Sequence, residues 1–335
     1  MTGLWFAVIS MLLAAMAVVL AKFGVKSTEG EAGAFIRTLV LAVAFWVTVF
    51  MSGSLGSIKT IAPMTFLYIA VSGIGWGLSH IFYFKALKTG TASKVVSVTH
   101  VSVVITAILS TLLTGSSGLT TLSAIALCLV IIGVIFITYK GKAPVWELIA
   151  VTIVVFAAFL VYYYLGDSIS LWIKIAFAVV LTGFAIYLMI NALRHHSAGK
   201  WLLFSLLSAV FAALTTYFFD SRVGAETMLI DGLRIIVVLI VCLVFLTVTG
   251  KWNKLKSVKG DSMFFLILSG AALAFSRYFL TQSTFLGYGY TANILAQIGI
   301  IVTVLLCVLF LKDKVTVRSG LGELLITLGY VLLVI

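Results

Sequence analysis

The chain has 335 residues, of which 63% are hydrophobic and 10% are charged, with a net charge of +12. Soluble domains are about 45–50% apolar and about 25% charged, so this chain has too few charges to cover a water-soluble fold of its length. The composition excludes a cytosolic enzyme, an extracellular module and a disordered chain. It predicts an all-α polytopic membrane protein.

Twelve apolar runs are long enough to cross a bilayer, for which a helix needs about 20 residues. They lie near 3–22, 34–53, 63–84, 94–114, 119–139, 145–165, 169–193, 201–219, 231–250, 262–283, 291–311 and 317–335. The two prolines, Pro63 and Pro144, each stand at the start of a run, where a missing N–H costs little. The first run lacks a basic leading segment, which favours a span over a signal peptide.

The positive charges predict the orientation of the chain. Most of the 22 Lys and Arg residues, Arg37 among them, fall in or beside the loops that follow odd-numbered spans. Because loops rich in Lys and Arg stay on the cytoplasmic side, we expect both termini of this cell-membrane protein to be extracytoplasmic. The excess charge therefore indicates topology and contact with membrane lipids rather than a nucleic-acid partner. Only five cations depart from this pattern, namely Lys59, Lys174, Arg222 and Arg234 in other loops and Arg277 inside a span.

The two ends of the chain resemble each other. An offset of 197 residues places Arg37 on Arg234, Ser79 on Ser276, His80 on Arg277, Gly90 on Gly287 and His100 on Gln297. This predicts two five-helix repeats, residues 1–142 and 198–335, separated by a two-helix insertion at 143–197. The second repeat begins after an odd number of spans, so the repeats have opposite orientations, as in many secondary transporters.

The stretch around Gly90 resembles the EamA branch of the drug/metabolite transporter superfamily. The residues that carry the resemblance are Tyr83, Lys85, Ala86, Leu87, Gly90, Ala92, Ser93, Lys94, Val95 and Ser102, with Arg37 and the segment 310–316 as weaker matches. The resemblance implies a ten-helix transporter of small metabolites without ATPase parts. This chain departs from the family in its two extra helices, its extracytoplasmic N-terminus, the Gly115–Gly118 stretch where an acid is usual, and the lack of a proline in the fourth helix.

Four polar residues are expected at the middle of the membrane. His80 and His100 are each ten residues from Gly90, and Arg277 and Gln297 are each ten residues from Gly287. Ten helical residues rise roughly 15 Å, about half the hydrocarbon thickness. The spacing sets the depth of these residues but not the direction in which they point.

Arg277 is the strongest candidate for binding cargo, because its guanidinium stays charged and suits carboxylate or phosphate. The alternative is an internal ion pair with Glu323 or Asp231. His80, His100 and Glu323 are candidates for proton coupling, since imidazole titrates near neutral pH. The alternative for each histidine is a hydrogen-bonded place in the core.

Further polar and aromatic residues surround the two predicted hairpins. Gln297, Asn293 and Gln282 would bind polar groups of a substrate or, alternatively, join helices by hydrogen bonds. Trp76 and Tyr83 would line a substrate pocket, whereas an interfacial aromatic belt explains Tyr288 and Tyr290 better. Lys85 and Lys88 are expected to be membrane-surface anchors. The lysines between 251 and 259 are expected to contact anionic headgroups.

No metal site, cofactor motif or catalytic set is predicted. Cys128, Cys242 and Cys307 lie within apolar runs and are expected to be buried thiols. The chain contains no His-Glu-x-x-His sequence and no acidic pair, which argues against an enzyme. We therefore expect a secondary transporter of a small polar, anionic metabolite, and as an alternative a flippase of a lipid-linked substrate. The sequence leaves open whether the chain acts as a homodimer.

Overall fold

The protein is a bundle of long apolar helices. The computed structural model describes residues 2–114, 121–138, 199–220 and 227–334, and this part of the chain is helical without strands. Six helical stretches within it are long and apolar enough to cross a membrane. Large apolar side chains such as Val43, Val47 and Leu309 remain exposed on the outside of the bundle, as the lipid-facing surface of a polytopic membrane protein requires.

The N-terminal half of the chain forms six α-helices. They are α1 (Thr2–Val25), α2 (Gly30–Met51), α3 (Pro63–Thr89), α4 (Ala92–Thr99), α5 (Ser102–Thr114) and α6 (Thr121–Thr138), with the short helix η1 (Ser54–Thr60) before α3. Pro63 occupies the first turn of α3, where its lack of an N–H is harmless. Gly53, with φ of +67°, allows the turn between α2 and η1.

The C-terminal half contributes six α-helices, of which α11 is a short connecting helix. They are α9 (Gly199–Asp220), α10 (Thr227–Val248), α11 (Trp252–Lys256), α12 (Gly260–Ser283), α13 (Gly289–Leu311) and α14 (Val317–Val334), with η2 (Thr284–Tyr288) joining α12 to α13. The turn predicted at Gly287 is present, and its φ of +85° needs a glycine. Ten predicted spans thus coincide with described helices. The predicted spans at 145–165 and 169–193, and the insertion 143–197 that contains them, lie outside the described residues.

The fourth predicted span is wrong as a single helix. The run 94–114 is divided at His100 and Val101, which separate α4 from α5. Hydrogen bonds between residues three apart, Val98 to Val101 and His100 to Val103, tighten the backbone there. The Thr99 hydroxyl donates to the carbonyls of Val95 and Val96, a type of side-chain bond that bends helices.

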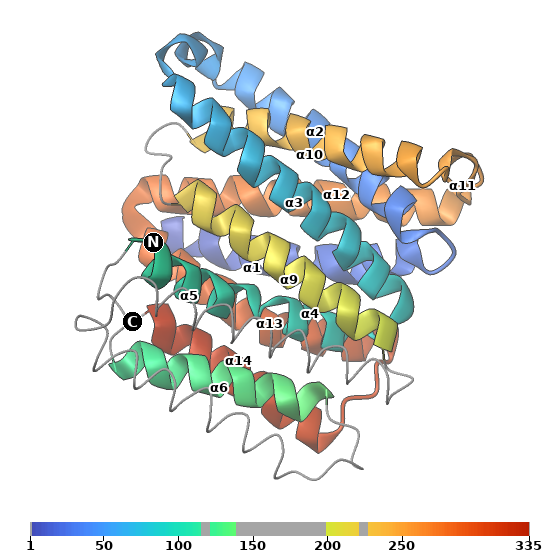
Figure 1. Ribbon diagram of the computed structural model, residues 1–335, viewed down its shortest axis with the longest axis vertical. Coiled ribbons are helices and arrows are strands. Elements are labelled where there is room, and N and C mark those ends of the chain that lie inside the picture. Colours follow the sequence, from blue (N-terminus) through green and yellow to red (C-terminus); the bar gives the residue numbers. More distant parts are fainter. Residues whose placement is uncertain (1, 115–120, 139–198, 221–226, 335) are drawn as a thin grey trace.

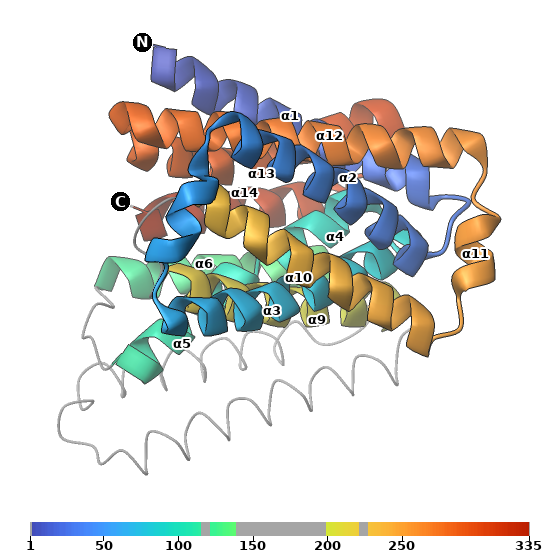
Figure 2. The same ribbon diagram turned by 90° about the horizontal axis from the view of Figure 1, so that it is seen from above.

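Helices from the two halves alternate in the bundle (Figures 1 and 2). The closest pairs are α1 with α12, α3 with α9, and α6 with α14, while α10 packs against both α2 and α3. Ser10 and Ser276 each donate to the other's carbonyl at 2.8 and 2.9 Å. Ser79 and Ser208 do the same at 2.9 and 3.0 Å. Such small hydroxyl residues let helices approach closely and bind across the interface.

Two glycine contacts repeat at the same sequence offset. A Cβ added at Gly73 would lie 2.7 Å from Val237 and 3.2 Å from the carbonyl of Arg234. A Cβ added at Gly270 would lie 2.8 Å from Val40 and 3.1 Å from the carbonyl of Arg37. All three positions of the second contact are related to the first by 197 residues. These matched contacts support the two-repeat organisation, which stays a prediction.

The bundle has two chemically different ends. We call one the basic end, and it holds the connections 26–29, 90–91, 249–259 and 312–316 with their lysines. Both chain termini lie at the other end, away from α11 (Figure 2). At the basic end the Lys22 ammonium donates to the carbonyl of Gly90 at 2.7 Å, and Asp313 accepts from the amide and the hydroxyl of Ser93 at 3.1 Å each. These bonds join α1, α4 and the α13–α14 connection.

Candidate functional site

One face of α3 gathers aromatic rings and arginines from three other helices. Trp76, His80 and Phe84 are spaced by four residues, and their rings contact one another in turn at 6.2 and 5.7 Å between centroids. Residues four apart share one face of a helix. The arginines that approach these rings are Arg37 of α2, Arg234 of α10 and Arg277 of α12.

Arg277 lies on the inner face of α12. Its guanidinium carbon is 6.0 Å from the centroid of the Trp76 ring. Gly270 and Leu273, seven and four residues earlier, face the core of the bundle, whereas Phe264 and Phe275 on the opposite face are 61% and 59% exposed. The Arg277 side chain is nevertheless exposed. Arg277 thus combines a place on the inner face of α12 with an exposed side chain.

The internal ion pair considered for Arg277 is not found in the described part of the chain. Asp231 pairs instead with Arg234, three residues along α10, at 3.1 Å. Glu323 is a buried residue, 5% exposed, and its Oε1 has no hydrogen-bond partner among the described residues. Within that part of the chain, no acid faces Arg277.

The placement of Arg37 and Arg234 in loops is wrong. Arg37 lies in α2 and Arg234 in α10, and their residues are 4% and 5% exposed. The Arg37 guanidinium carbon lies 5.5 Å from the Phe84 ring centroid, and that of Arg234 lies 3.8 Å from Phe219 and 4.5 Å from Trp76. Aromatic faces attract such cations through their quadrupoles. Both arginines were within predicted spans, yet counting cations near span ends assigned them to loops.

His80 lies between these arginines and is buried. Its residue is 8% exposed, and its Nε2 has no hydrogen-bond partner among the described residues. The structure places Trp76, His80 and Arg277 together, and Tyr83 follows on the same helix with its ring 6.0 Å from Phe84.

The other predicted residues lie outside this group of contacts. His100 is at the break between α4 and α5, with its ring 5.8 Å from the ring of Tyr330. Gln297 of α13 has a buried Oε1 without a partner in the described part of the chain. Asn293 is exposed on α13, and Gln282 is half-buried near the end of α12. Tyr330 is fully buried, and its contact with His100 gave no signal in the sequence because 230 residues separate them.

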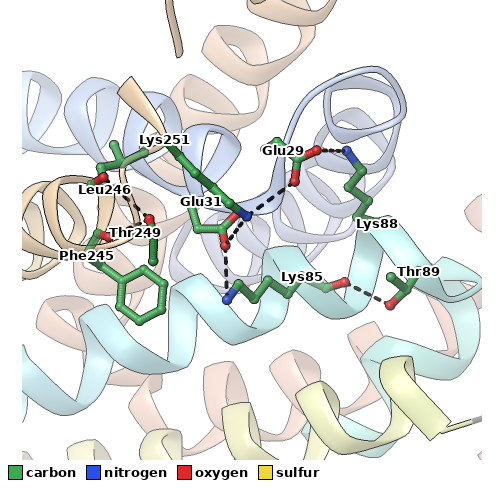
Figure 3. Close-up of polar contacts among 9 residues, drawn as sticks. All are labelled: Glu29, Glu31, Lys85, Lys88, Thr89, Phe245, Leu246, Thr249 and Lys251. Atoms are coloured by element: carbon green, nitrogen blue, oxygen red, sulfur yellow. Dashed lines mark hydrogen bonds and ion pairs between the residues drawn. The ribbon is translucent and has the colours of Figure 1, made fainter. Parts of the chain in front are cut away.

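A cluster of charged residues closes the basic end (Figure 3). Glu31 is 2% exposed and accepts from Lys85 at 3.0 Å and from Lys251 at 2.9 Å. Glu29 pairs with Lys88 at 3.0 Å and with Lys251 at 3.6 Å. We call these five residues the basic-end cluster. It ties together the starts of α2 and α11 and the end of α3, so Lys85 and Lys88 are ion-pair partners rather than surface anchors.

The loop members of the cluster have shifted pKa values. The hydrogen bond from Lys88 lowers the pKa of Glu29 below its ordinary 4.5. Burial lowers the pKa of Lys251, but the hydrogen bonds and charges of Glu31 and Glu29 outweigh that effect and raise it above its ordinary 10.5. Both groups are therefore charged at neutral pH.

No group of three or more His, Cys, Asp or Glu side chains in the described residues could hold a metal ion. Cys242 and Cys307 are buried as free thiols, and Cys128 is half-buried.

Comparison with known proteins identifies the first half of the chain. A model described as the EamA-like transporter family matches residues 1–139. A protein of Sinorhizobium sp named "Uncharacterized transporter in cobO 3'region" is 32% identical over 139 residues, which cover 41% of this chain and 97% of that relative. The match takes in α1 to α6, including Arg37 and the Trp76–His80–Phe84 face. This multi-pass membrane protein therefore belongs to the EamA-like transporter family of the drug/metabolite transporter superfamily.

Proposed function

We propose that the protein is a secondary transporter that moves a small, polar, anionic metabolite across the cell membrane. The observation that carries the proposal is Arg277, an exposed cation on the inner face of α12 that has no acid opposite it in the described chain. A permanent charge at this depth is costly and is usually retained for function. Trp76 provides an adjacent surface for the less polar part of a cargo.

Alternating access between two inverted repeats would move this cargo. The matched contacts of Gly73 with Val237 and of Gly270 with Val40 support two repeats whose equivalent residues make equivalent contacts with the other half. Transporters built in this way bind their cargo between the repeats near the middle of the membrane. His80 on α3 and Arg277 on α12 occupy equivalent positions under the offset of 197, one from each half.

The basic-end cluster supports a conformation closed on one side. At the other end of the bundle, the offset of 197 gives Met228 for Glu31, Gln282 for Lys85 and Phe285 for Lys88. Those residues cannot form the same ion pairs. Because the charge distribution assigns the basic end to the cytoplasm, we propose that this conformation is closed to the cytoplasm and that both termini are extracytoplasmic.

Proton coupling is proposed for His80, His100 and Glu323. Each has a side chain within the bundle, and His80 and Glu323 each carry an atom without a hydrogen-bond partner in the described chain. Gln297, Asn293, Gln282 and Tyr83 are proposed as further contacts for polar groups of the cargo. Membrane lipids surround the outer faces of the helices, and a homodimer is left open.

Uptake by purified protein in proteoliposomes tests the function. The cargoes are labelled dicarboxylates, phosphate esters, and neutral amides of matching size, supplied with and without a proton gradient. We expect saturable uptake of at least one anion and none of its neutral counterpart. A parallel assay with a lipid-linked phosphosugar tests the flippase alternative. Movement of that lipid without uptake of any soluble anion contradicts the proposal.

A further inference from the structure

Arg37 is a buried cation that forms no ion pair within the described part of the chain. Its residue is 4% exposed, and its Nε has no hydrogen-bond partner among the described residues. Its guanidinium carbon lies 5.5 Å from the centroid of the Phe84 ring. Arginine stays protonated when buried, so this position carries a full charge away from water, which is unfavourable unless an anion balances it.

The charge of the equivalent arginine in the second half, Arg234, is balanced by an acid. Arg234 is 5% exposed but has Asp231 three residues before it on α10, at 3.1 Å. The offset of 197 places Ala34 where Asp231 stands in the second half. If Arg37 served only in packing, we would expect it to have an acid on its own helix, as Arg234 does. The difference indicates that the counter-charge of Arg37 comes from elsewhere.

Arg37 lies between the basic-end cluster and the central residues. It is seven residues into α2, or about 10 Å below the start of that helix. Phe84, which it contacts, also contacts the ring of His80, and Trp76 continues this row to Arg277. Arg277 is exposed in this conformation, whereas Arg37 is covered beneath the closed basic end.

We propose that Arg37 is a second anion-binding residue for the cargo, which it receives from Arg277 when the bundle opens at its basic end. The proposal rests on the proposed function and adds a second site to it. The ligand would carry a carboxylate or a phosphate group, because both match the planar fork of a guanidinium. A cargo bound there supplies the missing counter-charge and so favours the conformation in which Arg37 is reached.

The test gives Arg37 the acid that Arg234 already has. Ala34→Asp places a carboxylate three residues before Arg37, and Ala34→Asn is a control of the same size without the charge. Labelled succinate and labelled inorganic phosphate serve as separate probes of the two anion classes. Uptake into proteoliposomes and equilibrium binding to the purified full-length protein are both measured, with thermal unfolding as the check on folding.

We expect the Ala34→Asp protein to take up the transported probe about tenfold more slowly than the Ala34→Asn protein. In Ala34→Asp the new carboxylate pairs with Arg37, so the cargo can no longer form its charge-assisted hydrogen bond there. The affinity of the probe for the site at Arg277 should change by no more than about twofold, because that site is distant from residue 34 and is not altered by the substitution. Arg37→Gln should behave as Ala34→Asp does, and Arg37→Lys should retain part of the uptake. The comparison of Arg37→Gln with Arg37→Lys tests the role of Arg37 if the Ala34→Asp protein does not fold.

Equal uptake by Ala34→Asp and Ala34→Asn, or by Arg37→Gln and the unmodified protein, overturns the role of Arg37 and leaves the proposed function standing. Loss of binding and uptake together in Arg37→Gln also overturns it, because Arg37 would then act in the initial site. If the unmodified protein takes up no anion at all, the proposed function fails and this inference fails with it.

Discussion

At the residue scale, three arginines within the bundle differ in how their charge is balanced. Arg234 has Asp231 and two aromatic faces, Arg37 has an aromatic face and no ion pair in the described part of the chain, and Arg277 is exposed beside Trp76. These differences in how the charges are balanced distinguish an arginine that stabilises the fold from arginines that we propose bind a ligand. We therefore assign Arg234, whose acid is on its own helix, to the fold, and we propose that Arg37 and Arg277 bind an anionic ligand.

Asp231→Asn should therefore destabilise the protein. The pair is 15% and 6% exposed at its side chains, so losing the carboxylate removes a charge-assisted interaction at a buried arginine, at a cost of about 1–3 kcal/mol. A lower thermal unfolding midpoint in detergent checks this. Asp261→Asn, which alters an exposed carboxylate at the start of α12, is the control, and equal midpoints for both variants would contradict the assignment.

At the element scale, helix positions follow from the sequence but some interactions do not. The length of the apolar runs predicted nine of the described helices as single spans, because a membrane span must be both long and apolar. The break at His100 escaped prediction because Thr99 bends the backbone without interrupting the apolar pattern. The basic-end cluster escaped it because Glu31 and Lys251 are 220 residues apart, and only the packed helices bring them together.

The basic-end cluster should make stability depend on pH through Glu29. Its lowered pKa means that its ion pairs stabilise the fold above pH 4.5 and lose this effect as the pH falls through the lowered value. Lys251, with its raised pKa, keeps its charge up to at least pH 10.5. The unmodified protein should therefore unfold at a higher temperature than Glu29→Gln at pH 7.

This difference in unfolding temperature should disappear at strongly acidic pH, where Glu29 is protonated. Lys88→Met, which removes the main partner, should lose stability at pH 7 to a similar extent. A difference between the unmodified protein and Glu29→Gln that is the same at acidic and neutral pH would show that the carboxylate charge is not what holds this end together.

At the scale of the whole molecule, helices from the two halves pack against each other in pairs. Ser10 with Ser276 and Ser79 with Ser208 tie α1 to α12 and α3 to α9 by the same pair of bonds. The offset of 197 residues that relates Ser79 to Ser276 was visible in the sequence, and Ser10 and Ser208 are related by 198 residues. The direction in which the side chains at mid-depth point was not, because spacing fixes depth along a helix but not which face meets a neighbour.

The central claim is that Arg277 binds an anionic cargo within this bundle. The most direct measurement is uptake of a transported anion by proteoliposomes that contain Arg277→Gln, compared with Lys59→Gln, an equal loss of charge at an exposed site of η1. We predict that Arg277→Gln folds but loses at least about tenfold in uptake, while Lys59→Gln transports normally. Unchanged uptake by folded Arg277→Gln would contradict the claim.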